Sequence, residues 1–384
     1  MEKQRLKRVR VENLEPNTRL TDDILSAKQT VLLRAGTILK RDFIAKLARW
    51  GIEHVYTHSD QFVAEREMDD TAEAVLDFFS ANKGMFLQRA ELQVVLEDKE
   101  LETLVSTTEG LYGDMLAESR TSIQPAMEVV QNMLRDLPPL RERLFRVSSE
   151  VPEAKHIIQH AVTSTMLFTL VLRADGYEEP RIVKLAAGSL FRDLGMAMLP
   201  PSILTKKGAL TKEEFAEVKK HPGTSATLLK KAEAVESETI MLVHQHHERW
   251  DGTGYPNGFQ ADEIVPEAQV LAICDAFCAM TAHRSYRKAI SPYETVTKII
   301  SLSGKQFSQL AANRFINRFG LYPVGTFVKL SDNNYAIVTR INEGRPTHPV
   351  VKVIVNEKLE EVEDGMEHDL AKMQDLFIVK VYRT

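Results

Sequence analysis

The sequence predicts a mainly helical protein with a small α+β module at its start and a small β unit at its end. Apolar side chains recur at helical spacing between about residues 66 and 318, strand-like runs precede residue 60, and strand-type runs follow Pro323. A chain of 384 residues with 43% hydrophobic content is long enough for two or three domains of roughly 100–200 residues. We expect four segments: an α+β module (1–65), a helical connecting region (66–150), a helical domain (151–320) and a β extension (321–384).

The first module combines strands with one helix. Residues 9–14 and 30–33 show strand-like apolar patterns. Residues 43–48 place apolar side chains on one helix face, and Gly51 ends that helix. A further strand is expected over 52–56, so the segment predicts a small α+β fold.

The spacing of apolar residues is helical in the connecting region and strand-like in the tail. Residues 72–79 and 127–134 each carry apolar side chains on one helix face. After Pro323 the pattern becomes strand-like. Strands are expected over 327–330, 335–338 and 350–355, with a turn at 332–334.

Composition and charge exclude several classes of protein. The net charge is −5, and the basic stretch from Lys3 to Arg10 is short, so we expect no DNA or RNA binding. No run approaches the roughly 18 apolar residues of a membrane span, and the start leads into no signal-peptide stretch, so a cytoplasmic location is expected. Cys274 and Cys278 lie in an apolar segment and are expected in the core without a disulfide.

The run from His244 to Pro256, HQHHERWDGTGYP, is the most informative stretch. Adjacent histidines such as His246 and His247 can both reach one metal ion, because neutral imidazole is a common ligand of first-row transition metals. A lone histidine is more often a packing residue. Two together before a glycine-rich turn with Tyr255 indicate a metal site.

Further candidate ligands lie before and after this run. Asp275 and Asp193 both follow strongly apolar residues, where a carboxylate is costly unless it is paired or binds a cation. His221 follows a helix with a capping box at Thr211 and Glu214. His156 and His160 share one helix face.

In this order the motifs resemble the HD-GYP family. The matching residues are His160, Asp193, His221-Pro222-Gly223, His246-His247-Glu248, Asp251-Gly252-Thr253-Gly254-Tyr255-Pro256, Asp275 and Arg284-Ser285-Tyr286-Arg287. That family is a branch of the metal-dependent HD phosphohydrolases, and its members cleave the bacterial messenger cyclic di-GMP. The resemblance covers about residues 151–318 closely.

The resemblance implies an HD-type helical bundle, a metal centre and a nucleotide pocket. Asp193 is expected to bridge two cations, of which iron or manganese fit best and zinc also fits. Tyr255, Arg284 and Arg287 match positions that hold the ligand. The implied metal ligands are His160, Asp193, His221, His246, His247 and Asp275.

Two positions depart from the family. Arg192 stands where the histidine before Asp193 is expected, and a guanidinium offers no lone pair to a metal. Met196 replaces a lysine on the substrate side. His156 stands where some relatives carry a glutamate that helps bind a third metal, which makes it a weaker ligand candidate. A literal pair, His368-Asp369, follows the other motifs and is expected on the surface.

These observations leave alternatives open. The first is a cyclic di-GMP phosphodiesterase whose hydrolysis is weakened by Arg192 and which binds fewer metal ions. The second is a catalytically silent receptor or scaffold for cyclic di-GMP or a signalling partner. A hydrolase for ordinary nucleotides would not explain the run from Asp251 to Pro256. The sequence gives no indication of the oligomeric state or of the input to residues 1–150.

Overall fold

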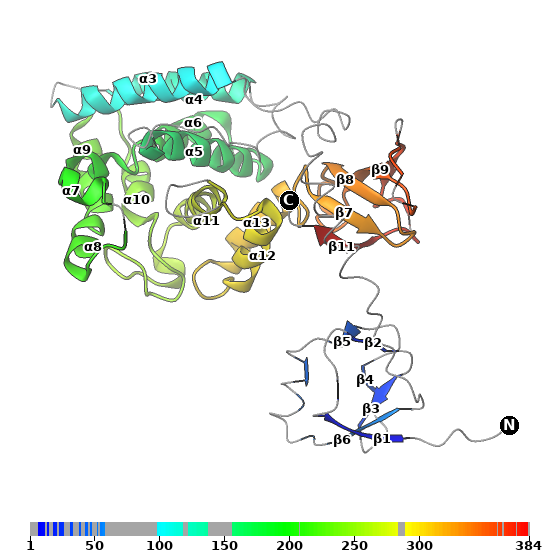
Figure 1. Cartoon of the computed structure of the whole chain (residues 1–384). Coiled ribbons are helices and arrows are strands. Elements are labelled where there is room, and N and C mark those ends of the chain that lie inside the picture. The colour runs from blue at the N-terminus through cyan, green and yellow to red at the C-terminus, as the bar shows by residue number, and fades with distance from the viewer. Residues whose placement is uncertain are drawn as a thin grey trace. The chain divides into compact units, whose positions relative to one another are not determined.

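The computed structural model divides into two compact units, Met1–Ala81 and Asn82–Thr384 (Figure 1). It describes residues 7–11, 14, 18–20, 23–26, 31–33, 38–39, 43–44, 47, 52, 54–57, 98–117, 122–136, 156–206, 208–282, 289–358, 360–362, 365–373 and 375–382. The predicted helix face over 72–79 lies outside these residues. The four expected segment boundaries stay predictions.

The first unit is a small sheet with its own core. One antiparallel sheet has the order β1-β6-β3-β4, and β2 pairs with β5. Its apolar core is centred on Ile24, Leu39, Leu47 and Val55, all fully buried. Leu47 is helical, as the sequence predicts, so this unit is an α+β module. The strands are β1 (Lys7–Arg10), β2 (Thr18–Arg19), β3 (Ile24–Leu25), β4 (Val31–Leu33), β5 (Ile38–Leu39) and β6 (His54–Thr57).

The second unit begins with a bundle of helices around one large apolar core. Helix α5 (His156–Ala174) lies at its centre and packs against α6 (Glu179–Leu190) and α11 (Pro266–Thr281). The remaining helices are α3 (Asp98–Leu116), α4 (Gln124–Asp136), α7 (Pro201–Leu204), α8 (Lys212–Val218), α9 (His221–Lys231), α10 (Ser237–Gln245), α12 (Pro292–Ser301), α13 (Gln309–Phe319) and the short 3₁₀ helices η5 (Leu194–Met198) and η6 (Ala261–Glu263).

Helix α5 is long and apolar enough, by length and composition alone, to cross a membrane. This helix departs from the expectation that no run approaches the length and apolar content of a membrane span. Of its most apolar window, 78% is buried inside the protein. Its neighbours α6 and α11 cover it, so we interpret it as the core helix of the bundle.

A capping box and a glycine fix the local structure of the segments that lead into the site. Thr211 Oγ1 accepts from the amide of Glu214 at 3.2 Å, and Glu214 Oε2 accepts from the amide of Thr211 at 2.7 Å, so the predicted capping box of α8 is confirmed. A Cβ added to Gly195 would lie 2.5 Å from the carbonyl oxygen of His221. The glycine therefore allows η5 to approach the start of α9 closely.

The tail forms a five-stranded antiparallel sheet of order β10-β9-β8-β7-β11. Strands β7 (Phe327–Leu330) and β9 (Val350–Val355) have the predicted bounds, and β8 (Tyr335–Arg340) is two residues longer than predicted. Strands β10 (Glu367–Asp369) and β11 (Ile378–Tyr382) were not predicted. The His368-Asp369 pair lies in β10, an edge strand outside the bundle. The predicted fold class, mainly α with a small α+β module and a small β extension, is confirmed.

Candidate metal centre

The candidate ligands come from separate segments of the bundle and converge in space. Their potential ligand atoms form two groups, in each of which all atoms lie within 4.8 Å, and Asp193 belongs to both. The first group is Asp193, His221, His246 and His247; the second is His160, Asp193 and Asp275. His160 is on α5, Asp193 follows α6, His221 begins α9, His246 and His247 follow α10, and Asp275 is on α11.

His221 and His246 both direct Nε2 toward Asp193. The two Nε2 atoms lie 3.3 and 3.8 Å from Asp193 Oδ1. Nδ1 of His221 donates to the carbonyl of Val218 at 2.7 Å, and Nδ1 of His246 donates to that of Val243 at 2.6 Å. In the neutral rings Nε2 therefore keeps its lone pair. Two such nitrogens, 3.4 Å apart beside a carboxylate, form an arrangement suited to a cation.

The electrostatic environment favours the metal-binding forms of these side chains. Burial and the neighbouring His246 lower the pKa of His247 well below its usual value, and burial also lowers the pKa of His246. Burial opposes ionisation of Asp193, but the positive charge of Arg192 holds the pKa of that carboxyl well below its usual value. Neutral imidazoles therefore face an ionised carboxylate.

The second group is already neutralised by protein side chains. His160 Nε2 lies 2.8 Å from Asp275 Oδ1. Nε of Arg192 donates to the same oxygen at 3.2 Å, and Nη2 lies 3.0 Å from it. Burial opposes ionisation of Asp275, but His160 and Arg192 lower the pKa of its carboxyl.

Arg192 is fully buried, with 0% exposure, and its guanidinium is held on several sides. Nη1 donates to the carbonyls of Ala161 and Ser189 at 3.3 and 3.2 Å, and Nη2 donates to that of His160 at 3.4 Å. Nη2 also lies 3.2 Å from Asp193 Oδ2. Because it has no exposed surface, Arg192 cannot touch a ligand in the pocket; it acts as an internal counter-ion.

The residues of the first group fit a divalent metal ion. Asp193 Oδ2 is buried and accepts no aligned hydrogen bond from any residue that the structure describes, although Arg192 lies close to it. Oδ1 of the same carboxylate faces the Nε2 lone pairs of His221 and His246, an arrangement that is costly unless a cation lies between them. Three imidazoles and one carboxylate are a donor set that first-row transition metals accept. The second group fits a second metal poorly, since Arg192 already pairs with both its carboxylates.

Tyr255 is placed beside the cluster by a tightly packed loop. Its ring centroid is 4.8 Å from that of His247, and its amide donates to the carbonyl of His247 at 3.2 Å. The buried carboxylate of Glu248 accepts from the amides of Asn257 and Gly258 at 2.7 and 3.1 Å. A Cβ on Gly254 would lie 2.3 Å from the amide nitrogen of Arg249 and 2.6 Å from Cα of Glu248. Only glycine lets the loop close over this segment.

A pocket of about 360 Å³ opens beside the cluster, within the range of small-ligand sites. His246, His247, Tyr255 and Asp275 are among its lining residues. Phe215, Lys219 and Arg249 also line it and were not among the candidate residues predicted from the sequence. Of these three residues, only Arg249 could have been suspected from the sequence, because it lies within the HQHHERWDGTGYP run that carries the ligands.

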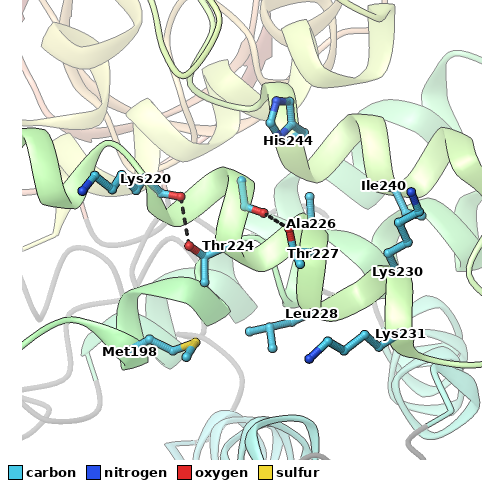
Figure 2. A pocket seen from close by; sticks show the side chains of 11 residues that line it. Met198, Lys220, Thr224, Ala226, Thr227, Leu228, Lys230, Lys231, Ile240 and His244 are labelled. Atoms are coloured by element: carbon cyan, nitrogen blue, oxygen red, sulfur yellow. Dashed lines mark hydrogen bonds between the residues drawn. The ribbon is translucent and has the colours of Figure 1, made fainter.

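A second hollow, of about 660 Å³, lies beside α9 and α10 and contains none of the candidate metal ligands (Figure 2). Lysines such as Lys220 and Lys230 line it, together with His244. His244 Nε2 contacts Oδ1 of Asn257 at 2.6 Å and belongs to neither ligand group. The first histidine of the informative run is therefore directed away from the centre.

The other sequence-based candidates have different positions. His156 is half-buried at the start of α5 and belongs to neither ligand group. Met196 is half-buried in η5 and does not line the 360 Å³ pocket. Arg284 and Arg287 lie outside the described residues. Cys274 and Cys278 are buried and free, as predicted.

Two family models and several curated proteins match this chain. Residues 128–308 match the family described as HD domain, and residues 327–384 match the family described as KOW domain associated with HD domain. A cyclic di-GMP phosphodiesterase of Pseudomonas aeruginosa is 30% identical over 199 residues, which are 52% of this chain and 48% of that protein. A cyclic di-GMP phosphodiesterase of Borreliella burgdorferi is 28% identical over 200 residues, 52% of each chain.

A 3′3′-cGAMP-specific phosphodiesterase of Vibrio cholerae is 25% identical over 226 residues, 58% of this chain and 47% of that protein. The chain thus spans about half the length of these relatives. Among solved structures, an HDG"Y"P protein from Bdellovibrio bacteriovorus aligns over 81% of this chain and 98% of its own, at 15% identity and a TM-score of 0.46. The resemblance of the helical region to the HD-GYP family is confirmed, and this region is an HD-type bundle with a candidate divalent metal site.

Proposed function

We propose that this protein is an HD-GYP-type cyclic di-GMP phosphodiesterase whose hydrolysis is weakened because Arg192 stands at a metal-ligand position. One observation carries the proposal. Four ligand side chains, Asp193 with three histidines, converge within 4.8 Å beside a pocket lined by Tyr255. The names of the relatives support cyclic di-GMP as the substrate.

The side chains of the first group would hold one ion, for which iron or manganese fits best. A bound divalent ion supplies Lewis-acid stabilisation of phosphoryl charge and lowers the pKa of a water molecule. Asp193 would serve as a metal ligand and orient the imidazoles of His221 and His246, whose Nδ1 atoms are fixed by backbone carbonyls. Tyr255 offers a ring face for a guanine base.

Arg192 is the reason to expect slow turnover. Its guanidinium pairs with Asp275 and approaches Asp193, so it neutralises charge that a second cation would otherwise neutralise. Because it is fully buried, it does not reach the substrate and cannot replace the Lewis acidity of a metal. We expect fewer metal ions than in relatives with the full ligand set.

A silent receptor or scaffold is the second candidate function. Burial of Arg192 and its pairing with Asp275 favour it, because this half of the centre is stable without a metal. A receptor would bind cyclic di-GMP, or a signalling partner, without turnover. We further propose a cytoplasmic location and no role in DNA or RNA binding.

Two measurements on the full chain test the proposal. Binding of cyclic di-GMP is followed by calorimetry with manganese or with anaerobic ferrous iron. Release of the linear dinucleotide and of mononucleotide is followed by chromatography. Binding with slow, metal-dependent release is the expected result; binding without any release supports the receptor. Absence of cyclic di-GMP binding under both metal conditions contradicts the phosphodiesterase and the cyclic di-GMP receptor, and leaves only a scaffold for a signalling partner.

A further inference from the structure

We propose that Lys219 and Arg249 form a phosphate subsite on the wall of the 360 Å³ pocket. The inference rests on the proposed function and assigns a ligand contact to two residues outside the metal centre. Both side chains line the same pocket as His247 and Tyr255. Lys219 follows α8, whereas Arg249 lies in the loop after α10, so two elements bring positive charge to one cavity.

The guanidinium of Arg249 is oriented by neutral partners. Nη2 donates to Oε1 of Gln306 at 2.6 Å, and Nη1 donates to Oγ1 of Thr253 at 3.4 Å. No carboxylate among the residues that the structure describes forms an ion pair with it within 4.0 Å. Hydrogen bonds from Thr253 and the charge of Arg249 lower the pKa of the nearby Asp251 carboxyl, but Arg249 forms no direct ion pair with it. The guanidinium is therefore fixed in place without a salt bridge, which suits a planar donor for phosphate.

Lys219 is held by aromatic rings instead of an acid. Its Nζ lies 5.6 Å from the ring centroid of Tyr255 and 5.0 Å from that of Phe215. In the described part of the chain, no ion pair involves its ammonium group. Phe215 is 44% exposed and lines the same pocket. The rings and the ammonium group thus present a stacking surface next to a cation.

The acidic side chains that line the pocket form no ion pair within 4.0 Å with Lys219 or Arg249. Asp275 is paired with Arg192, and the carboxylate of Glu248 accepts from the backbone amides of Asn257 and Gly258. The two cations are therefore available to a phosphate at this wall of the pocket. Met196, which stands where the family has a substrate-side lysine, does not line this pocket.

The test uses the full chain loaded with manganese and cyclic di-GMP as the probe. Lys219→Met keeps the apolar stem over the rings, and Arg249→Gln keeps a donor for Gln306. Lys230→Met is the matched control, because Lys230 lines the other hollow (Figure 2). We expect each pocket variant to raise the Kd about tenfold, or about 1.4 kcal/mol, with unchanged metal content. The control should stay within about twofold.

Unchanged Kd values in both pocket variants would overturn the subsite while leaving the proposed function intact. If the wild type binds no cyclic di-GMP, the proposed function fails, and inorganic phosphate then decides the subsite. Broadening of its phosphorus resonance by bound manganese should be strong in the wild type and weak in Lys219→Met and Arg249→Gln. Equal broadening in all three, or none in the wild type, overturns the proposal.

Discussion

Nη2 of Arg192 lies 3.0 Å from Oδ1 of Asp275, inside the bundle and away from solvent. The carboxylate of Asp275 is thus paired with a cation that belongs to the chain. The same guanidinium approaches Asp193, the residue shared by both ligand groups. In the metal centre, the second ligand group therefore already contains a cation, the guanidinium of Arg192, whereas the three histidines of the first group face Asp193 without one.

The first prediction concerns metal content. Protein purified with manganese should bind about one equivalent, because Arg192 pairs with the carboxylates of the second group. Arg192→His should raise the content toward two, since imidazole adds a neutral ligand. Elemental analysis of both proteins measures the ratio. Two tightly bound ions in the wild type would contradict the assignment of Arg192 as an internal counter-ion.

The second prediction concerns stability. Arg192→Met leaves Asp193 and Asp275 buried without their shared cation, and breaking a buried ion pair costs about 3–5 kcal/mol. The free energy of unfolding of the metal-free variant should fall by about 3 kcal/mol, measured by urea titration. Added manganese should restore more stability to the variant than to the wild type, because it can neutralise the unpaired buried carboxylates. Equal stability of the two metal-free proteins would refute the ion-pair argument.

The third prediction concerns the loop that carries Tyr255. Gly254→Ala places a Cβ within 2.6 Å of the backbone at Glu248, so the loop must move. Binding of cyclic di-GMP should weaken at least about tenfold, or about 1.4 kcal/mol. Gly113→Ala on α3 is the control, because a Cβ there meets nothing within 4 Å. It should preserve affinity and slightly stabilise the helix.

The fourth prediction concerns a support behind the centre. Tyr112 on α3 donates to the carbonyl of Leu190 at 2.7 Å and stacks on Phe191 at 5.7 Å, just before Arg192 and Asp193. Tyr112→Phe keeps the ring but leaves a buried carbonyl without this donor. The free energy of unfolding should drop by about 1 kcal/mol, the usual contribution of such a bond. Thermal unfolding measures it, and an unchanged transition would argue against the contact.

Much of the centre was predictable because its residues occur in ordered motifs. Adjacent histidines such as His246 and His247, and carboxylates in apolar segments such as Asp275, have few structural explanations other than a metal site. The resemblance then related Asp193 to residues distant in sequence. The sequence could not give the position of the Arg192 side chain, because the same residue could lie in solvent or inside the bundle.

The structural features that the sequence did not predict have physical causes. Surface lysines are common, so nothing in the sequence separates Lys219 from Lys230; only the rings beside Lys219 distinguish it. His244 shares a run with the ligands, but it lies two residues before His246, about half a helical turn, and its ring contacts Asn257 instead. Strand β11 is mostly half-exposed, so its apolar alternation is weak.

The last prediction separates missing chemistry from a missing pocket. Arg192→His with Met196→Lys supplies a neutral ligand and a cation, while Gly195 between them keeps η5 close to α9. Hydrolysis of cyclic di-GMP should rise by at least about a hundredfold, because a second Lewis acid can contribute several kcal/mol and each 1.4 kcal/mol or so is about tenfold in rate. Arg192→His alone is the matched control, and its rate shows how much of the gain in hydrolysis comes from the added metal ligand. Rates are measured with manganese or anaerobic ferrous iron from the nucleotides released.

A double variant that is folded and contains two metal ions but is no faster than the parent would mean that the pocket has diverged. A parent that is already fast would show instead that Arg192 does not impair the site.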